Sequence, residues 1–178
     1  MLSFGGPRKL GVPILDALSP PSRVHAHCDI PCGIYDPHEA QISALTVVRM
    51  MQLIGELPKL SSSAKPEEVE AYHAKLSRFT LVKEQHAERV KSELRILWGD
   101  YFTADHVKAH PTLHEAFWKA MKQASKARQG TSLPDAQELL AQTQQIAEIF
   151  WKTKNVPTHR LPSSQKAGGE LVYPAPAA

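Results

Sequence analysis

The chain has 178 residues, of which 42% are hydrophobic and 22% are charged. These values predict one compact domain with a hydrophobic core of its own, and they exclude a small scaffold that depends on disulfides. No stretch approaches the roughly 20 consecutive apolar residues of a membrane-spanning helix, so a membrane-spanning protein is excluded. Residues 27–154 contain 16 basic and 16 acidic side chains, and this neutral balance disfavours a nucleic-acid-binding protein.

Residues 1–26 differ from the rest of the chain and hold four of its 14 prolines. Their apolar run from Leu10 to Leu18 is interrupted by Pro13 and Asp16, which makes a poor core for a secretory signal. Val24 and Ala26 nevertheless fit the small-residue pattern that precedes a cleavage site. We interpret residues 1–26 as a leader that a peptidase removes and that does not direct secretion, and we expect a cytoplasmic protein.

Four segments show helical periodicity, over residues 36–57, 66–99, 111–130 and 132–154. Asp36 and Glu39 predict a capping box for the first segment, and Gly130 predicts a left-handed cap at the end of the third. Four helices with mostly short connections predict an all-α fold, an antiparallel up-down four-helix bundle. We expect residues 155–178, which contain Pro, Gly and Ala but few large apolar residues, to form a disordered tail.

Both cysteines of the chain lie in one short segment, His-Cys-Asp-Ile-Pro-Cys-Gly-Ile-Tyr-Asp-Pro, at residues 27–37. Their spacing does not match that of a zinc knuckle. If the chain were cut after Ala26, the free amine of His27, the amide nitrogen and thiolate of Cys28, and the thiolate of Cys32 would offer two nitrogens and two sulfurs in one plane. The His27 imidazole could reach an axial position. This donor set is typical of Ni(II) or Cu(II), and the residues alone leave both open.

The same segment resembles the metal-binding hook of the nickel-containing superoxide dismutases, whose mature chains begin at the histidine. Further segments resemble that family in the same order, and together they cover residues 27–154; they are Val-Lys-Glu-Gln at 82–85, Leu-Trp-Gly-Asp-Tyr-Phe at 97–102, Pro-Thr-Leu-His at 111–114 and Ile-Phe-Trp-Lys-Thr-Lys at 149–154. The resemblance implies an enzyme that converts superoxide to dioxygen and hydrogen peroxide by cycling between Ni(II) and Ni(III). It also implies one nickel ion per subunit and a homohexamer.

Residue by residue, the resemblance implies that His27, Cys28 and Cys32 bind the nickel. It implies that Tyr35 stands over the open face of the metal and that Tyr101 supports it through hydrogen bonds. Backbone amides around Asp29 and Cys32, ordered water and a protonated thiolate are the candidate proton sources, and we assign Asp29, Tyr35 and Tyr101 to the catalytic site.

The sequence departs from the family at four positions. Ser43 and His86 stand where family members place a glutamate and an arginine that orient the axial imidazole, so we expect a different redox tuning. Thr103 and Arg128 stand where family members place lysines that attract the substrate anion. We therefore expect weaker electrostatic steering.

Two alternatives come from the residues themselves. A non-catalytic helical bundle could store or deliver a thiophilic metal through Cys28 and Cys32, and it would not require a free amine at His27. The second alternative is a zinc site at His106, His110 and His114, which are spaced by four residues. Because Pro111 interrupts that helix, we expect these histidines to be solvated or hydrogen-bonded instead.

Overall fold

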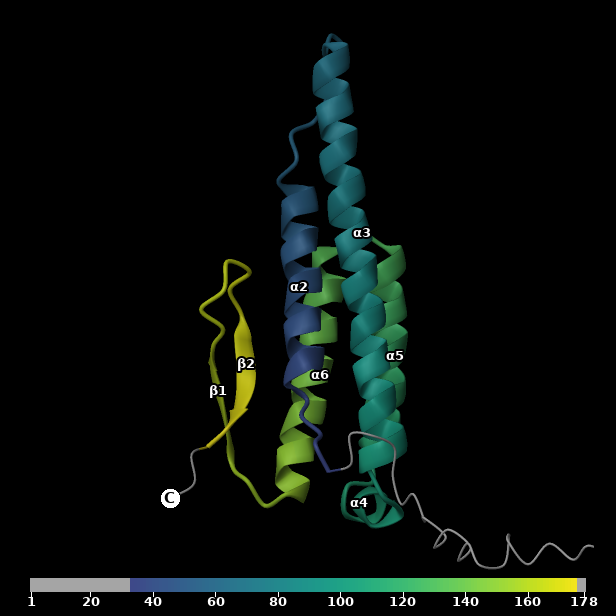
Figure 1. The fold of residues 1–178 in the computed structure, drawn as a ribbon, viewed down its shortest axis with the longest axis vertical. Coiled ribbons are helices and arrows are strands. Elements are labelled where there is room, and N and C mark those ends of the chain that lie inside the picture. Colours follow the sequence, from purple (N-terminus) through teal and green to yellow (C-terminus); the bar gives the residue numbers. More distant parts are fainter. Residues whose placement is uncertain (1–32, 176–178) are drawn as a thin grey trace, which may run out of the picture. The chain divides into compact units, whose positions relative to one another are not determined.

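The computed structural model describes residues 33–175, so the leader, the predicted metal ligands His27, Cys28 and Cys32, and the predicted catalytic residue Asp29 lie outside the described residues. Its elements are α2 (His38–Gly55), α3 (Pro66–Ile96), a π-helical turn η1 (Leu97–Tyr101), α4 (Ala104–Ala109), α5 (Leu113–Gln129), α6 (Leu133–Thr153), β1 (Thr158–Pro162) and β2 (Glu170–Pro174) (Figure 1).

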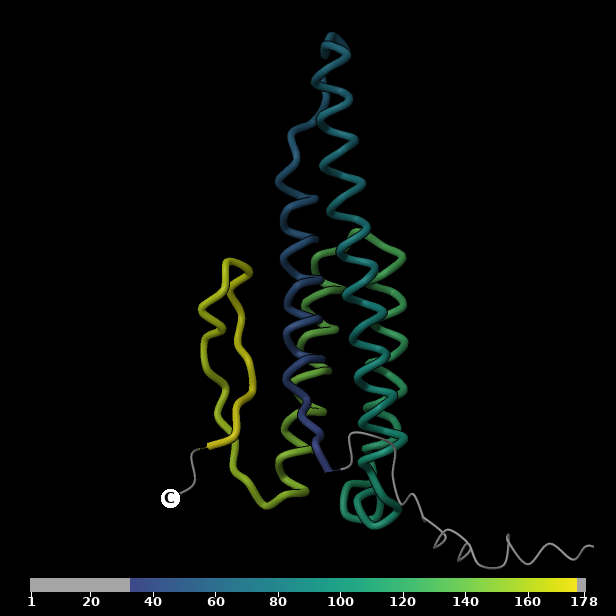
Figure 2. The backbone as a smooth tube through the Cα atoms, viewed as in Figure 1, coloured from purple at the N-terminus to yellow at the C-terminus, as the bar shows by residue number. Residues whose placement is uncertain are grey.

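The four long helices α2, α3, α5 and α6 form the predicted bundle. Neighbours along the chain run in opposite directions, and α2 also packs on α6 while α3 packs on α5 (Figure 2). Within residues 33–175, no helix is both long enough and apolar enough to cross a membrane. The antiparallel packing of α2, α3, α5 and α6 confirms the predicted all-α up-down four-helix bundle for the helical part of the chain.

The core of the bundle is built from apolar side chains at helical spacing. On α5 the buried stripe consists mostly of small residues, which let the neighbouring helices approach closely; its members are Leu113, Phe117, Ala120, Ala124 and Ala127. Larger side chains from α3 and α6 fill the space opposite this stripe, among them Leu94, Leu139 and Phe150.

Two details of the predicted helix ends are wrong. Asp36 Oδ1 does accept a hydrogen bond from the His38 amide at 2.7 Å, but no capping box forms, because Glu39 pairs with Arg89 at 2.8 Å instead. Gly130 has an extended backbone with φ −97°, so it is not a left-handed cap. Its carbonyl accepts a hydrogen bond of 2.6 Å from Lys83 Nζ. Burial lowers the pKa of Lys83, and its ammonium group meets the negative end of α5.

The connection from α3 to α5 contains structure that the sequence did not predict. The second helix does not run regularly to Gly99 but widens into the π-helical turn η1, where the Phe102 amide donates to the Leu97 carbonyl at 3.0 Å. Thr103 then caps the short helix α4 by accepting from the His106 amide at 3.4 Å. These turns place Tyr101 against the end of α6.

The predicted disorder of residues 155–178 is wrong for the described part of this segment. Strands β1 and β2 pair antiparallel, with Arg160 opposite Val172. Gly168 and Gly169, at φ 70° and 72°, turn the chain between the strands in the left-handed region that favours glycine. Leu171 and Val172 are each only 1% exposed, so this hairpin adds to the core.

Buried glutamines on the bundle supply the hydrogen bonds that hold the hairpin. Gln41 on α2 donates to the Val172 carbonyl at 3.1 Å and accepts from the Val172 amide at 2.7 Å, which reproduces the pairing of a neighbouring strand. Gln144 on α6 donates to the Glu170 carbonyl. Two buried apolar side chains and a satisfied strand edge explain why this segment is ordered.

Candidate metal centre

The described chain begins immediately after the last predicted metal ligand. Gly33 has φ 78°, a conformation that favours glycine and turns the chain between Cys32 and α2. Six residue steps along the chain separate Cys32 from His38, the first residue of α2. The predicted hook is therefore tethered to the beginning of this helix.

The structure brings together the two tyrosines that the sequence singled out. The rings of Tyr35 and Tyr101 lie 5.7 Å apart with an interplanar angle of 54°, although 66 positions separate them in the chain. The Tyr35 hydroxyl oxygen is buried. Ile34, directly before Tyr35, is 77% exposed. The two rings thus form a contact just before α2, and their position at the metal and their catalytic roles remain predictions.

Tyr101 is held on several sides by aromatic rings. Its ring stacks on that of His106 at 5.5 Å and 23°, and it packs against Phe150 at 4.4 Å and Phe102 at 5.0 Å. Its hydroxyl lies 2.7 Å from Thr153 Oγ1 at the end of α6. The ring of Tyr101 thus has one fixed position among α4, η1 and α6.

Ser43 on α2 and His86 on α3 lie at one level of the α2–α3 contact, one turn from the ion pair between Glu39 and Arg89. Ser43 is fully buried, and neither its Oγ nor the buried His86 Nδ1 has a hydrogen-bond partner among residues 33–175. Burial and the neighbouring Arg89 lower the pKa of His86, while Glu39 opposes this shift. Both buried polar atoms therefore keep unused hydrogen-bonding capacity within the described residues.

The residues at the predicted steering positions have other partners. Thr103 caps α4, and Arg128 donates to Glu88 at 2.7 Å, where Arg95 also binds. Neither side chain carries an unpaired positive charge toward Tyr101.

Lys154 is a cation near Tyr101 that our sequence analysis did not identify. Its Nζ lies 4.8 Å from the ring centre of Phe150, 5.5 Å from Tyr101 and 5.7 Å from Trp151. The signal was the run Phe-Trp-Lys-Thr-Lys at the end of α6, in which two aromatic residues are followed by two lysines. Thr153 belongs to the same run and was also missed.

The alternative zinc site finds no support in the part of the chain that the structure describes. No three His, Cys, Asp or Glu side chains of residues 33–175 gather closely enough to hold a metal ion. His106 stacks on Tyr101, and His114 packs on Trp98 at 5.2 Å. The expectation of solvated or hydrogen-bonded histidines agrees with the structure, because His106 Nδ1 accepts a hydrogen bond from the Thr103 amide at 3.2 Å and His114 is exposed.

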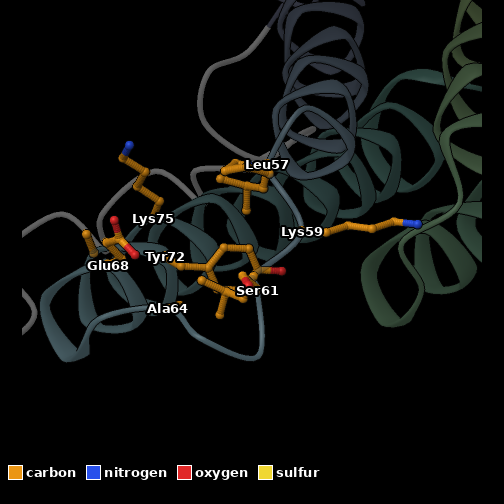
Figure 3. Close-up of a pocket in the computed structure, with 10 residues that line it drawn as sticks. Leu57, Lys59, Ser61, Ala64, Glu68, Tyr72 and Lys75 are labelled. Atoms are coloured by element: carbon orange, nitrogen blue, oxygen red, sulfur yellow. The ribbon is translucent and has the colours of Figure 1, made fainter.

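A cavity of about 350 Å³ lies at the other end of α2 (Figure 3). Its walls come from the segment after α2 and from the first turns of α3, including Leu57, Ser61 and Tyr72. Tyr35 precedes the beginning of α2 and the cavity follows its end, so the cavity is not part of the candidate metal centre.

Comparison with known proteins gives matches over most of the chain. Residues 22–154 match the sequence profile of nickel-containing superoxide dismutase. The superoxide dismutase [Ni] of Streptomyces seoulensis is 37% identical over 136 residues, which are 76% of this chain and 94% of that protein. The superoxide dismutase [Ni] of Streptomyces coelicolor is 35% identical over the same shares.

Solved structures agree with these sequence matches. A crystal structure of Ni-containing superoxide dismutase, with nickel ligation corresponding to the oxidized state, shares 35% sequence identity with a TM-score of 0.61. The match covers 72% of this chain and 99% of that one. A native nickel superoxide dismutase structure matches over the same shares with a TM-score of 0.58. The β1–β2 hairpin follows the last residue of the profile match.

Proposed function

Because this chain belongs to the nickel-containing superoxide dismutase family, we propose that its nickel is bound by the residues that follow Ala26. The chain is a superoxide dismutase with nickel as its cofactor, and superoxide is its substrate. The proposed ligands are the amine and imidazole of His27, the amide nitrogen and thiolate of Cys28, and the thiolate of Cys32. The observation that carries the function is the family match over residues 22–154, which includes all of these positions.

The reaction joins two superoxide anions and two protons to give dioxygen and hydrogen peroxide. Bound nickel supplies the one-electron redox chemistry by alternating between the +2 and +3 states. The two thiolates and the amide nitrogen donate the electron density that makes the higher state accessible. Tyr35 and Tyr101 restrict access and order water, and backbone amides around Asp29 and Cys32 deliver protons.

Ser43 and His86 would contact the axial imidazole of His27. In support, Ser43 Oγ and His86 Nδ1 are buried and have no partner within residues 33–175. A hydroxyl and an imidazole replace a charged pair at these positions, so the hydrogen bonds to the axial ligand would be weaker here. The ion pair between Glu39 and Arg89 holds α2 and α3 in register one turn away.

We further propose how the chain is processed, where it is located and how it assembles. A peptidase removes residues 1–26, and residues 27–154 form the hook and bundle. A cytoplasmic location is supported by the chemistry of the hook, because a reducing compartment keeps Cys28 and Cys32 as thiolates. The family resemblance supports a homohexamer, and the exposed side chains of Ile34 and Trp118, 77% and 55% exposed, offer apolar contact area.

The state of the N-terminus distinguishes this proposal from the alternative function, a non-catalytic bundle that stores metal. We would measure the N-terminal sequence and the nickel content of one purified sample and compare three chains: full length, cut before His27, and cut before Ala26. Only the chain that begins at His27 should dismute superoxide, because one additional residue moves the amine off the metal. Equal activity of all three chains would show that the ligand assignment is wrong.

A further inference from the structure

The last turn of α6 contains two hydrogen bonds that share one hydroxyl group. Thr153 Oγ1 lies 2.7 Å from the Phe150 carbonyl oxygen and 2.7 Å from the Tyr101 hydroxyl oxygen. A threonine hydroxyl has one proton to donate and two lone pairs to accept with. The two neighbours therefore determine where that proton lies.

The Phe150 carbonyl can only accept a hydrogen bond, so Thr153 donates its proton there. The end of the helix explains the need for this bond: the Lys154 amide, which would reach the Phe150 carbonyl in a continuing α-helix, donates to the Trp151 carbonyl at 3.0 Å. Threonine side chains commonly bond back to carbonyls in this way. Because the Thr153 proton is committed to Phe150, the hydrogen bond to Tyr101 exists only if Tyr101 is the donor.

The direction of the Tyr101 hydroxyl is fixed as a result. Its ring packs against those of His106, Phe102 and Phe150, which restrict its rotation. A phenol hydrogen prefers the plane of its ring and so has two positions, one of which points at Thr153. With the proton held there, the Tyr101 oxygen offers only lone pairs to anything else that approaches.

We infer that Thr153 is a positioning residue that makes the Tyr101 hydroxyl a hydrogen-bond acceptor, and not a donor, at the metal centre. The inference rests on the proposed function for the location of Tyr101 beside the nickel hook. An acceptor there binds species that carry protons, such as water and the product hydrogen peroxide. It gives no hydrogen bond to anions such as superoxide, which accordingly receives its protons from other groups.

The test compares Thr153→Val, which removes the hydroxyl but keeps the shape, with Thr153→Ser, which keeps it. Thr143→Val is the matched control, because Thr143 is a buried threonine of the same helix whose hydroxyl donates to the Leu139 carbonyl at 2.8 Å. In Thr153→Val the Tyr101 proton becomes free to turn toward an anion. Inhibition by azide should then tighten about tenfold or more, the size expected for one added hydrogen bond to a charged group. Thr153→Ser and Thr143→Val should keep the wild-type inhibition constant.

A second measurement does not depend on activity. The tyrosine doublet in ultraviolet resonance Raman spectra reports whether a phenol donates or accepts, and subtracting the spectrum of a matched Tyr101→Phe protein isolates Tyr101. In wild type and Thr153→Ser, the Tyr101 phenol should give the donor signature, because it donates its proton to residue 153. Thr153→Val should lose this signature. If Thr153→Val does not fold, Thr153→Ala replaces it. An acceptor signature in wild type, or unchanged azide inhibition in Thr153→Val, would overturn the inference. Absence of nickel or of dismutation in the wild-type chain would count against the proposed function instead, and the Raman comparison would still test Thr153.

Discussion

Replacing Lys154 with methionine should slow the capture of superoxide without changing the fold. Methionine keeps most of the length of the aliphatic stem over Phe150, Tyr101 and Trp151 but removes the charge. Thr103 and Arg128 do not present a free positive charge near Tyr101, since one is uncharged and the other pairs with Glu88. Lys154 is therefore the cation expected to attract the substrate.

The magnitude follows from the position of the ammonium group. Lys154 Nζ lies 5.5 Å from the centre of the Tyr101 ring. For an anion beside that ring, at about 7 Å from an exposed ammonium, the attraction in water is about 0.6 kcal/mol, which corresponds to about a threefold change in rate. We expect kcat/KM to fall by about threefold at low ionic strength, and the difference to vanish near 1 M salt, where the screening length is about 3 Å.

The assay is the decay of superoxide, followed by stopped flow or pulse radiolysis, at equal nickel content and over a series of salt concentrations. Lys152→Met is the matched control, because it removes the same charge from the same turn of α6 while Lys154 keeps its place over Tyr101. If both variants lose the same activity, the effect belongs to net charge alone. If the loss in Lys154→Met persists at high salt, the side chain acts by contact, and the steering argument is refuted.

Four further predictions follow from the hook, the tyrosine pair, the hairpin and the buried imidazole. Cys28→Ser and Cys32→Ser should each abolish nickel binding and activity while circular dichroism shows unchanged helix content, because the ligands precede α2; loss of helix in both would indicate a structural metal or a disulfide. Tyr35→Phe should retain nickel and substantial turnover but change saturation and azide sensitivity in stopped-flow measurements, and full nickel occupancy without turnover would make the hydroxyl an obligatory proton donor. Gln41→Leu leaves two buried backbone groups of β2 without partners, so urea denaturation should show a loss of about 2 to 6 kcal/mol; an unchanged midpoint would contradict this account of the hairpin. Since the pKa of His86 lies below its usual value of 6.5, the unfolded chain binds more protons, so the free energy of unfolding should fall as the pH drops through and below that value; His86→Gln should flatten this dependence, and an equal slope would assign it to other groups.

The bundle could be predicted from sequence because its signals are local. Apolar residues recur at helical spacing, and prolines and glycines lie near the helix boundaries, as at Pro66 and Pro134. The hairpin could not be predicted, because its order depends on distant partners: Gln41 lies 131 positions from Val172. The left-handed cap expected at Gly130 failed for a similar reason, since Lys83, 47 positions away, satisfies its carbonyl instead.

The candidate site likewise contains features that local sequence predicts and features that depend on distant contacts. The predicted ligand set of the hook rests on donor chemistry at one short segment, and the predicted roles of Tyr35 and Tyr101 rest on the resemblance to a family. The contact between Tyr35 and Tyr101 requires the η1 turn, which no local sequence pattern predicted. Thr153 and Lys154 both contact Tyr101, so their proposed roles depend on contacts between residues about 50 positions apart.

The hairpin also has a practical consequence for handling the protein. Its Tyr173 ring lies 5.7 Å from the ring of His38, the first residue of α2, so the described end of the chain lies beside the helix to which the hook is joined. Only five residues would separate Tyr173 from a polyhistidine tag placed after Ala178. Imidazoles attached there would compete for the same nickel ion, and metal analysis of tagged protein would count both sites. Purification should therefore use an affinity handle without metal ligands, or a tag that is cleaved before nickel is added.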